Sequence, residues 1–338
     1  MNLANLRNRL LISMLLGIVV FAGLLAYGDF KEVATSFEEF KWWLFPLILL
    51  VTSGNYLLRF VKWEYYLAQI GVTGLKRSDS FLIYFSGLGM TVTPGKVGEW
   101  LKSYLLREMH GTPLTRSAPI LLAERLTDSL ALLIICAFGV IAFATNTWPI
   151  VVVIAVGSAV AIGVSRHRPT SHGIIRFLGR FPLLQRFTGH FEEFYESTYT
   201  LMEPRGLVLM TVLSVASWFF EVLAYYLTLI GLGVDGGTDT MLKAAFILPI
   251  STLAAALSFM PGGLLVAEIG ITGLSRRLLD LSKTTATVGT VIVRLATLWF
   301  GVILGLIAFA YLARRLGNQG ITLDPHDTTL PAPADPAA

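Results

Sequence analysis

Long uncharged apolar runs are the feature that most restricts how this chain can fold. A helix needs about 20 apolar residues to cross the roughly 30 Å of hydrocarbon in a bilayer. Runs near or above that length occupy residues 10–27, 42–61, 117–145, 148–164, 206–232 and 284–313. Only 14% of the residues are charged, whereas an ordinary soluble protein has about 25%. The pattern excludes a soluble enzyme and predicts an all-α, polytopic membrane helical bundle.

Two further apolar stretches, residues 80–93 and 244–260, are shorter. Glycine interrupts the first, and proline follows the second. A helix that stops inside a membrane is tolerated where its end is buried in protein or lines a cavity. We therefore expect each stretch to be one arm of a re-entrant broken-helix hairpin. For 244–260, a full crossing is the alternative.

Basic residues in short loops indicate the orientation, because they stay on the cytoplasmic side. Arg7 and Arg9 place the N-terminus in the cytoplasm, and no small-residue cleavage site follows Tyr27, so the first run is expected to remain as a signal anchor. The loop 28–41 is acidic and fits the outer side. The other basic residues expected inside are Arg59, Lys62, Lys76, Arg77, Arg166, Arg168, Arg176, Arg180, Arg186, Arg314 and Arg315.

One basic cluster conflicts with this rule. Arg276, Arg277 and Lys283 lie outside if the second short stretch dips, and inside if it crosses. We favour the dip, because Arg314 and Arg315 after the last run are then cytoplasmic.

Two segments outside the apolar runs differ in composition. Residues 170–200 interleave large apolar side chains with arginines, which predicts a helical pair lying on the cytoplasmic leaflet; a solvated linker packed on the bundle is the alternative. The tail, residues 317–338, is rich in Pro, Asp, Thr and Ala and is expected to be disordered.

One pattern occurs twice along the chain. The first copy is Thr93-Pro94-Gly95-Lys96-Val97-Gly98-Glu99, followed by Glu124-Arg125-Leu126. The second is Met260-Pro261-Gly262-Gly263-Leu264-Leu265-Val266-Ala267-Glu268, followed by Val293-Arg294-Leu295. Internal repeats of this kind are typical of transporters. We divide the chain into a first transmembrane repeat, residues 1–145, and a second, residues 146–316.

Each repeat is expected to hold three spans and one re-entrant hairpin, so the two repeats insert with inverted topology. The breaks at Pro94-Gly95 and Pro261-Gly262-Gly263 then enter from opposite faces. Broken helices expose N-terminal backbone N–H groups, which attract an anion such as a phosphate, and glycine lets the ligand approach the backbone. The alternative is that each Pro-Gly pair only makes a tight turn at the membrane surface.

Several charged residues lie within the apolar runs. A charge at the bilayer centre costs about 2.5–3.5 kcal/mol on insertion scales and needs a partner or a hydrated cavity. Glu124 and Asp128 are four residues apart and share a helix face, and Arg125 can reach Asp128 three residues on. Arg294 has no neighbouring acid in the sequence. Glu221 lies near the middle of its run, so we expect it to pair with Arg294 or Arg125.

Four further charged residues follow the breaks and complete the candidate substrate-binding set: Lys96, Glu99, Lys102 and Glu268. Arg59 and Lys62 are interpreted differently, as long side chains that reach from the end of a span to the membrane surface.

Several kinds of site find no support in the sequence. The single cysteine, Cys136, lies inside an apolar run and is interpreted as a small core residue. The five histidines have no zinc-ligand spacing. We find no catalytic triad pattern and no nucleotide-binding loop. No metal, cofactor or catalytic residue is therefore assigned, and a net charge of +4 does not suggest nucleic acid.

With these motifs, the chain resembles the flippase-like transmembrane family typified by the membrane part of lysylphosphatidylglycerol synthases. The similar pieces are Thr93–Glu99 with Tyr104-Leu105-Leu106, Glu124-Arg125-Leu126-Thr127-Asp128, Phe259–Gly263 to Glu268, and Arg294-Leu295-Ala296-Thr297-Leu298-Trp299. Where that family commonly has Pro-Gly-Gly-Leu-Gly, this chain has Leu265 in place of the last glycine.

The resemblance implies an integral inner-membrane protein that binds or translocates a lipid with a charged head group. Full-length synthases carry a soluble aminoacyl-transferase domain, which this chain does not show after its last span, so lipid aminoacylation by this chain is not expected. Relatives associated with polyprenyl-linked glycans extend the substrate list to isoprenoid phosphates.

Two functional hypotheses follow. In the first, the two breaks form an alternately accessible site for an anionic lipid. Lys96, Arg125 and Arg294 pair with its charge, and Glu99, Glu124 and Glu268 order those cations or relay protons. In the second, the chain is a membrane subunit or enzyme of lipid-linked glycan or lipid modification, with Glu124 and Asp128 as acid and base. A homo-oligomer or a partner from lipid biosynthesis is compatible with both.

Overall fold

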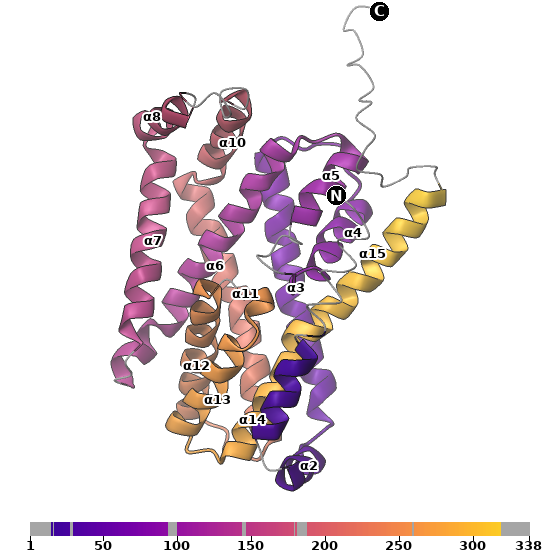
Figure 1. Cartoon of the computed structure of the whole chain (residues 1–338), viewed down its shortest axis with the longest axis vertical. Coiled ribbons are helices and arrows are strands. Elements are labelled where there is room, and N and C mark those ends of the chain that lie inside the picture. The colour runs from indigo at the N-terminus through magenta and orange to yellow at the C-terminus, as the bar shows by residue number, and fades with distance from the viewer. Residues whose placement is uncertain are drawn as a thin grey trace, which may run out of the picture.

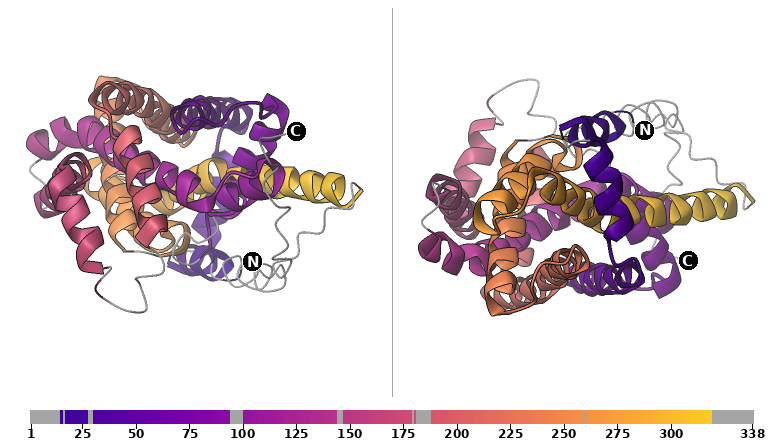
Figure 2. Two further views of the ribbon diagram at one scale, coloured as in Figure 1. Left: turned by 90° about the horizontal axis from the view of Figure 1, so that it is seen from above. Right: turned by 90° about the horizontal axis from the view of Figure 1, so that it is seen from below.

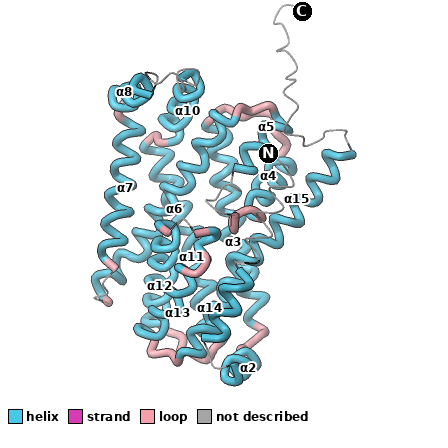
Figure 3. The backbone as a smooth tube through the Cα atoms, viewed as in Figure 1, coloured by secondary structure: helices cyan, strands magenta, loops and turns pink. Residues whose placement is uncertain are grey.

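The computed structural model describes residue 15 and residues 17–27, 30–93, 100–143, 147–178, 180, 188–258 and 260–318. Pro94, Gly95, Lys96 and Glu99 lie outside the described residues, as does the tail apart from residues 317 and 318, which end the last helix. The described part of the chain is helical and contains no strand (Figure 3). This confirms the all-α prediction.

The helices follow one another along the chain in this order. They are α2 (Phe30–Glu39), α3 (Leu44–Gln69), α4 (Arg77–Leu88), α5 (Leu101–His110), α6 (Leu114–Ala142), α7 (Trp148–Arg166), α8 (Arg168–Leu178), α10 (Thr188–Leu201), α11 (Pro204–Gly231), α12 (Thr238–Leu257), the 3-10 turn η2 (Pro261–Gly263), α13 (Val266–Leu278), α14 (Lys283–Arg294), the π-helical turn η3 (Leu295–Trp299) and α15 (Phe300–Asn318).

Among the described residues, five helical stretches are long and apolar enough to cross a membrane. They are Leu44–Gln69, Trp148–Arg166, Pro204–Gly231, Thr238–Leu257 and Lys283–Leu316. Four of them match predicted spans. The predicted run 117–145 forms most of α6, which is 29 residues long, and the first run contains a shorter apolar helix, Gly17–Tyr27.

The stretch 244–260 forms a longer helix than the uncharged run indicates. α12 has 20 residues and begins at Thr238, before the run, with Asp239 in its first turn. A negative charge there is favourable, because it lies at the positive end of the helix dipole. A search for uncharged residues misses this polar first turn.

The first helical hairpin, α4 and α5, lies at the upper end of the molecule in Figure 1. α4 runs antiparallel to α15, as two contacts show: Asp79 pairs with Arg315 at 2.6 Å near one end, and Gly89 lies against Gly305 near the other. A Cβ added at Gly305 would lie 2.0 Å from the Gly89 nitrogen. The two backbones therefore touch, which requires glycine on both sides.

The second hairpin, α12 and α13, begins and ends at the lower end in Figure 1. At that end, the Lys41 amide before α3 donates to the Gly231 carbonyl before α12. Thr284, which follows α13, donates to Glu32 of α2 at 2.8 Å. The turn between α12 and α13 lies at mid-height, as Figure 3 shows.

Val92, just after α4, lies against the turn of the second hairpin in the middle of the molecule. A Cβ added at Gly262 would lie 3.1 Å from Cγ1 of Val92, the residue that precedes Thr93-Pro94 in the first break. Around this point, α3 and α11 pack side by side, and Asn55 of α3 donates to the Ser217 carbonyl of α11 at 2.7 Å.

α7, α8 and α10 lie on one side of the bundle, and α15 extends on the opposite side (Figure 2). α7 exposes a row of valines, Val152, Val153, Val156 and Val160, which suits contact with lipid. α8 exposes Ile174 and Phe177. α8 and α10 provide the predicted helical pair; its position on a leaflet stays a prediction.

Candidate functional site

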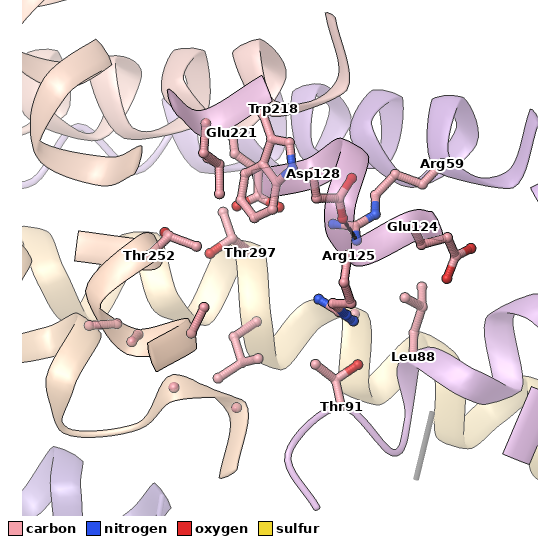
Figure 4. A pocket seen from close by; sticks show the side chains of 18 of the residues that line it. Arg59, Leu88, Thr91, Glu124, Arg125, Asp128, Trp218, Glu221, Thr252 and Thr297 are labelled. Carbon is pink, nitrogen blue, oxygen red and sulfur yellow. Dashed lines mark hydrogen bonds and ion pairs between the residues drawn. The ribbon is translucent and has the colours of Figure 1, made fainter. Parts of the chain in front are cut away.

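A cavity of about 190 Å³ lies where the two hairpins meet. α3, α4, α5, α6 and α11 contribute to its wall, together with α12, η2, α13 and the helix that runs from α14 through η3 into α15. Its charged lining residues are Arg59, Lys102, Arg125, Arg294, Glu124, Asp128 and Glu221. Four are cations and three are anions, so the described lining has a net positive charge. Figure 4 labels Arg59, Glu124, Arg125, Asp128 and Glu221 of this group.

Asp128 of α6 is the centre of a buried ion cluster. Its Oδ2 accepts from Arg59 at 2.6 Å, and its Oδ1 accepts from Lys62 at 2.6 Å and from Ser214 at 3.1 Å. Lys62 is 2% exposed and also donates to the Ser214 hydroxyl at 2.7 Å. The cluster therefore ties α3 and α11 to α6.

The prediction that Arg59 and Lys62 reach to the membrane surface is wrong. Both side chains turn inward from α3 to the Asp128 carboxylate, because an ion pair in the protein offsets the cost of charge within a span. The spacing of the two residues in the sequence indicates this arrangement. Arg59 and Lys62 are three residues apart and therefore share a helix face, and such a doubly cationic face within a span requires an acid from another helix.

Lys102 of α5 makes a second ion pair with α6. Its Nζ lies 2.6 Å from Glu124 Oε2, 4.8 Å from the Trp63 ring centre and 5.3 Å from that of Tyr84. Both rings present their electron-rich faces to the ammonium, which is a favourable contact. The ion pair and the two ring contacts of Lys102 therefore fix the first hairpin to α6.

Arg294 makes the corresponding connection in the second half of the chain. Its Nε lies 2.5 Å from Oε1 of Glu268 in the first turn of α13. Its Nη2 donates to the Gly262 carbonyl at 2.9 Å. The arginine thus holds the turn of the second hairpin by its backbone and by its following helix.

The second break has an unusual backbone. Gly262 and Gly263 have φ values of 59° and 67°, which glycine adopts without strain. Leu265, where the resemblance led us to expect a glycine, has φ 73° and ψ −52°, a conformation that is costly for a residue with a Cβ. α13 then begins without a side-chain cap.

A π-helical turn follows Arg294 and widens the helix where it passes the cavity. Such turns disturb the regular hydrogen-bond ladder and often occur at functional sites. Here the Thr297 carbonyl accepts from the Tyr56 hydroxyl of α3 at 2.5 Å. The turn therefore gives the last long helix a polar contact with the first long helix beside the cavity.

Glu221 lines the same cavity. Arg294, one of the two arginines that we expected to pair with Glu221, is bonded to another acid. Arg294 is bonded to Glu268, and within the described residues no hydrogen bond or ion pair joins it to Glu221, although the two charges interact electrostatically. Arg125 points from α6 into the cavity, as Figure 4 shows. The side chain of Trp218, one helical turn from Glu221, stacks against Arg59 at 5.3 Å.

Most of the predicted site residues that the structure describes come together. Those that line the cavity are Lys102, Glu124, Arg125, Asp128, Glu221, Gly262, Gly263 and Arg294. Glu268 is bonded to Arg294, and Pro261 begins η2. The lining residues that the sequence did not indicate are mainly Arg59, Tyr56, Tyr84 and Trp218. Within the described ranges, no group of three or more His, Cys, Asp or Glu side chains could hold a metal ion.

Comparisons with known proteins identify the kind of protein. The family described as lysylphosphatidylglycerol synthase TM region matches residues 14–305. A relative described as a UPF0104 membrane protein, from Methanothermobacter thermautotrophicus, is 21% identical over 339 aligned positions, which cover 92% of this chain and 95% of the relative. Together with the apolar helices, these matches identify a multi-pass membrane protein, and the chain belongs to the lysylphosphatidylglycerol synthase transmembrane-region family.

Proposed function

We propose that this protein binds the anionic head group of a lipid in the central cavity and moves the lipid between the leaflets of the inner membrane. The observation that supports the proposal most is the place of the cavity. It lies where two hairpins from opposite ends of the molecule meet. A ligand there can be exposed to either end by a movement of one hairpin.

The charge of the lining fits an anion. With four cations and three anions among the described lining residues, a singly charged phosphate balances the site. Arg294 and Arg125 are the groups that we assign to the phosphate, because a guanidinium presents a fork of N–H donors that matches phosphate oxygens. Lys102 contributes a further positive charge beside them.

The size of the cavity fits a head group and excludes the acyl chains. Pockets for drug-sized ligands have volumes of about 300–1,000 Å³, whereas this cavity has about 190 Å³. In the proposed mechanism the head group enters the protein and the hydrocarbon chains stay in the bilayer. A phospholipid and a polyprenyl phosphate both meet this requirement.

The proposal includes a topology. The two hairpins are re-entrant, the halves 1–145 and 146–316 are inverted repeats, and the upper end in Figure 1 is cytoplasmic. Arg166, Arg168 and Arg315 lie at that end, which fits the retention of basic residues inside.

The alternative, an enzyme that modifies a lipid or a lipid-linked sugar, is less well supported. It requires one carboxyl group to act as an acid and another as a base. Glu124 is held by Lys102, and Asp128 is held by Arg59 and Lys62. Both carboxylates are therefore engaged with cations of the protein, which favours the transporter.

The test is a leaflet-exchange assay in liposomes. Purified protein is reconstituted with acyl-labelled phosphatidylglycerol or with a labelled polyprenyl phosphate, and an impermeant quencher measures how fast the inner label becomes accessible. We expect Arg294→Gln and Arg125→Gln to reduce the rate by at least about tenfold, because each loses a charged contact to phosphate. Arg168→Gln, which removes an exposed pair with Glu196, serves as the control and retains the rate.

The outcomes separate the alternatives. Exchange of only one of the two lipids identifies the head-group class. Equal exchange by wild type and both cavity variants contradicts the site assignment, and no exchange of either lipid by wild type contradicts the proposed function. Chemical conversion of the labelled lipid without exchange supports the enzyme.

A further inference from the structure

Glu268 is a buried carboxylate with only one of its two oxygens satisfied. Its side chain is 0% exposed. Oε1 accepts from Arg294, whereas Oε2 has no hydrogen-bond donor among the described residues. Asp128 differs, because Lys62 and Ser214 contact its Oδ1 and Arg59 contacts its Oδ2. Glu268 therefore depends on one cation, and Asp128 on two.

Arg294, the cation bonded to Glu268 among the described residues, also forms part of the cavity wall. Arg294 lines the cavity, and Glu268 lies behind it, bonded to the guanidinium Nε. A phosphate that enters the cavity meets the same guanidinium from the open side. Phosphate and Glu268 are thus two anions that share one cation.

Because the phosphate and Glu268 share the Arg294 guanidinium, the Glu268 carboxylate is stabilised less once the phosphate is bound. A buried carboxylate that shares its cation with a second anion is destabilised, because the added negative charge lies close to it and little water is present to screen the repulsion. Addition of a proton at Oε2 removes the negative charge and turns the unsatisfied oxygen into a hydroxyl. The proton comes from a hydronium ion that reaches Oε2 through the cavity: one O–H bond of the hydronium breaks as the Oε2–H bond forms, a water molecule is released, and nothing is oxidised or reduced.

We propose that binding of an anionic head group to Arg294 is coupled to uptake of a proton by Glu268. This inference rests on the proposed function and adds the proton as the ion that binds together with the lipid. By linkage, a lower pH strengthens lipid binding, and bound lipid strengthens proton binding at Glu268. A proton gradient across the membrane can then give the exchange a direction.

The other charged groups around α13 do not replace Arg294 in this role. From α14 and α11, the neighbouring groups are Arg294 and Glu221, both on the cavity. Tyr225 of α11 bonds to Ser275, two turns after Glu268. The charged residues of α12, Asp239 and Lys243, pair with each other near the start of that helix. On α13 itself, Arg276 and Arg277 lie in the last turn.

The test measures protons and lipid together. Full-length protein in detergent, in a weakly buffered solution at pH 7 with an indicator dye, is titrated with short-chain phosphatidylglycerol, and binding is measured on the same samples. We expect wild type to take up about one proton per bound lipid and to lose up to about tenfold in affinity per unit rise in pH. Glu268→Gln is expected to bind lipid without proton uptake and with a flatter pH dependence. Glu196→Gln, which neutralises a half-exposed acid, is the matched control.

Each result decides for or against the inference. Wild type that binds lipid without proton uptake overturns it and leaves the proposed function intact, and so does Glu268→Gln that keeps the wild-type uptake. Infrared difference spectra of wild type upon lipid addition give a second readout that does not depend on a variant. A new band from a protonated carboxyl supports the inference, and its absence overturns it. Failure of wild type to bind phosphatidylglycerol, combined with absence of exchange in liposomes, overturns both proposals.

Discussion

The free-energy cost of a charged residue within a helix depends on its partners as well as on its burial. Asp128 is 4% exposed and carries a full charge, yet both of its oxygens are bonded to cations. A buried charge that loses its partner typically costs about 3–5 kcal/mol. The cation–anion clusters are therefore expected to contribute more to stability than the exposed ion pairs on the same molecule.

We predict that Asp128→Ala lowers the free energy of unfolding by about 3–5 kcal/mol, because Arg59 and Lys62 lose their shared partner. The matched control is Asp239→Ala, which breaks an i,i+4 pair whose acid is 72% exposed and should cost less than about 1 kcal/mol. Thermal unfolding in detergent, followed by tryptophan fluorescence, measures both. Similar decreases in Tm for the two variants would mean that the buried cluster is not stabilising.

The backbone at Leu265 supports a prediction of the opposite sign. A residue in this region of φ and ψ costs about 1–3 kcal/mol, and glycine avoids that cost while adding about 0.5–1 kcal/mol of chain entropy. Leu265 is 45% exposed, so little buried contact is lost. We expect Leu265→Gly to raise the Tm. Leu257→Gly, at a similarly exposed position in α12, should lower it, and a decrease for both would contradict the strained conformation.

Among the helices, the contact between α4 and α15 depends on two glycines. Gly305→Ala places a Cβ against the backbone of Gly89, and such overpacking typically costs about 1–3 kcal/mol. We predict a lower Tm and slower lipid exchange, because α4 leads into the first break. Gly157→Ala is the control, since nothing lies within 4 Å of its added Cβ. Wild-type exchange by Gly305→Ala would show that this contact does not position the hairpin.

The helices could be predicted from the sequence better than the contacts between them. Apolar runs indicate a helix because each crossing must satisfy its own backbone, and the Pro-Gly pairs mark where a helix stops. The start of α12 was missed, because its first turn is polar. Partners such as Glu268 for Arg294, or Lys62 for Asp128, lie on helices far apart in the chain. Neither spacing nor composition indicates which buried charges meet.

At the scale of the whole molecule, the central contact between the two hairpins agrees with the repeated pattern in the sequence. The repeated Pro-Gly pattern led us to expect two breaks near one another. The contact of Val92 with Gly262 places the residues beside the first break against the second, although Pro94 to Glu99 lie outside the described residues. The orientation of this arrangement in a membrane depends only on charge distribution and can be tested directly.

We predict that the two ends of the molecule face different compartments. The native cysteine, Cys136, is buried, so a cysteine introduced on the surface gives the dominant signal. Thr170 lies in α8, which is at the upper end in Figure 1, and Asp235 lies in the connection from α11 to α12 at the lower end; both positions are exposed. An impermeant maleimide should label Asp235→Cys in intact cells and Thr170→Cys only after permeabilisation, because short basic loops of membrane proteins are typically retained in the cytoplasm. The unmodified protein gives the background labelling of Cys136.

The reverse labelling pattern would mean that the molecule has the opposite orientation in the membrane. Labelling of both positions from outside would contradict the entry of the two hairpins from opposite sides.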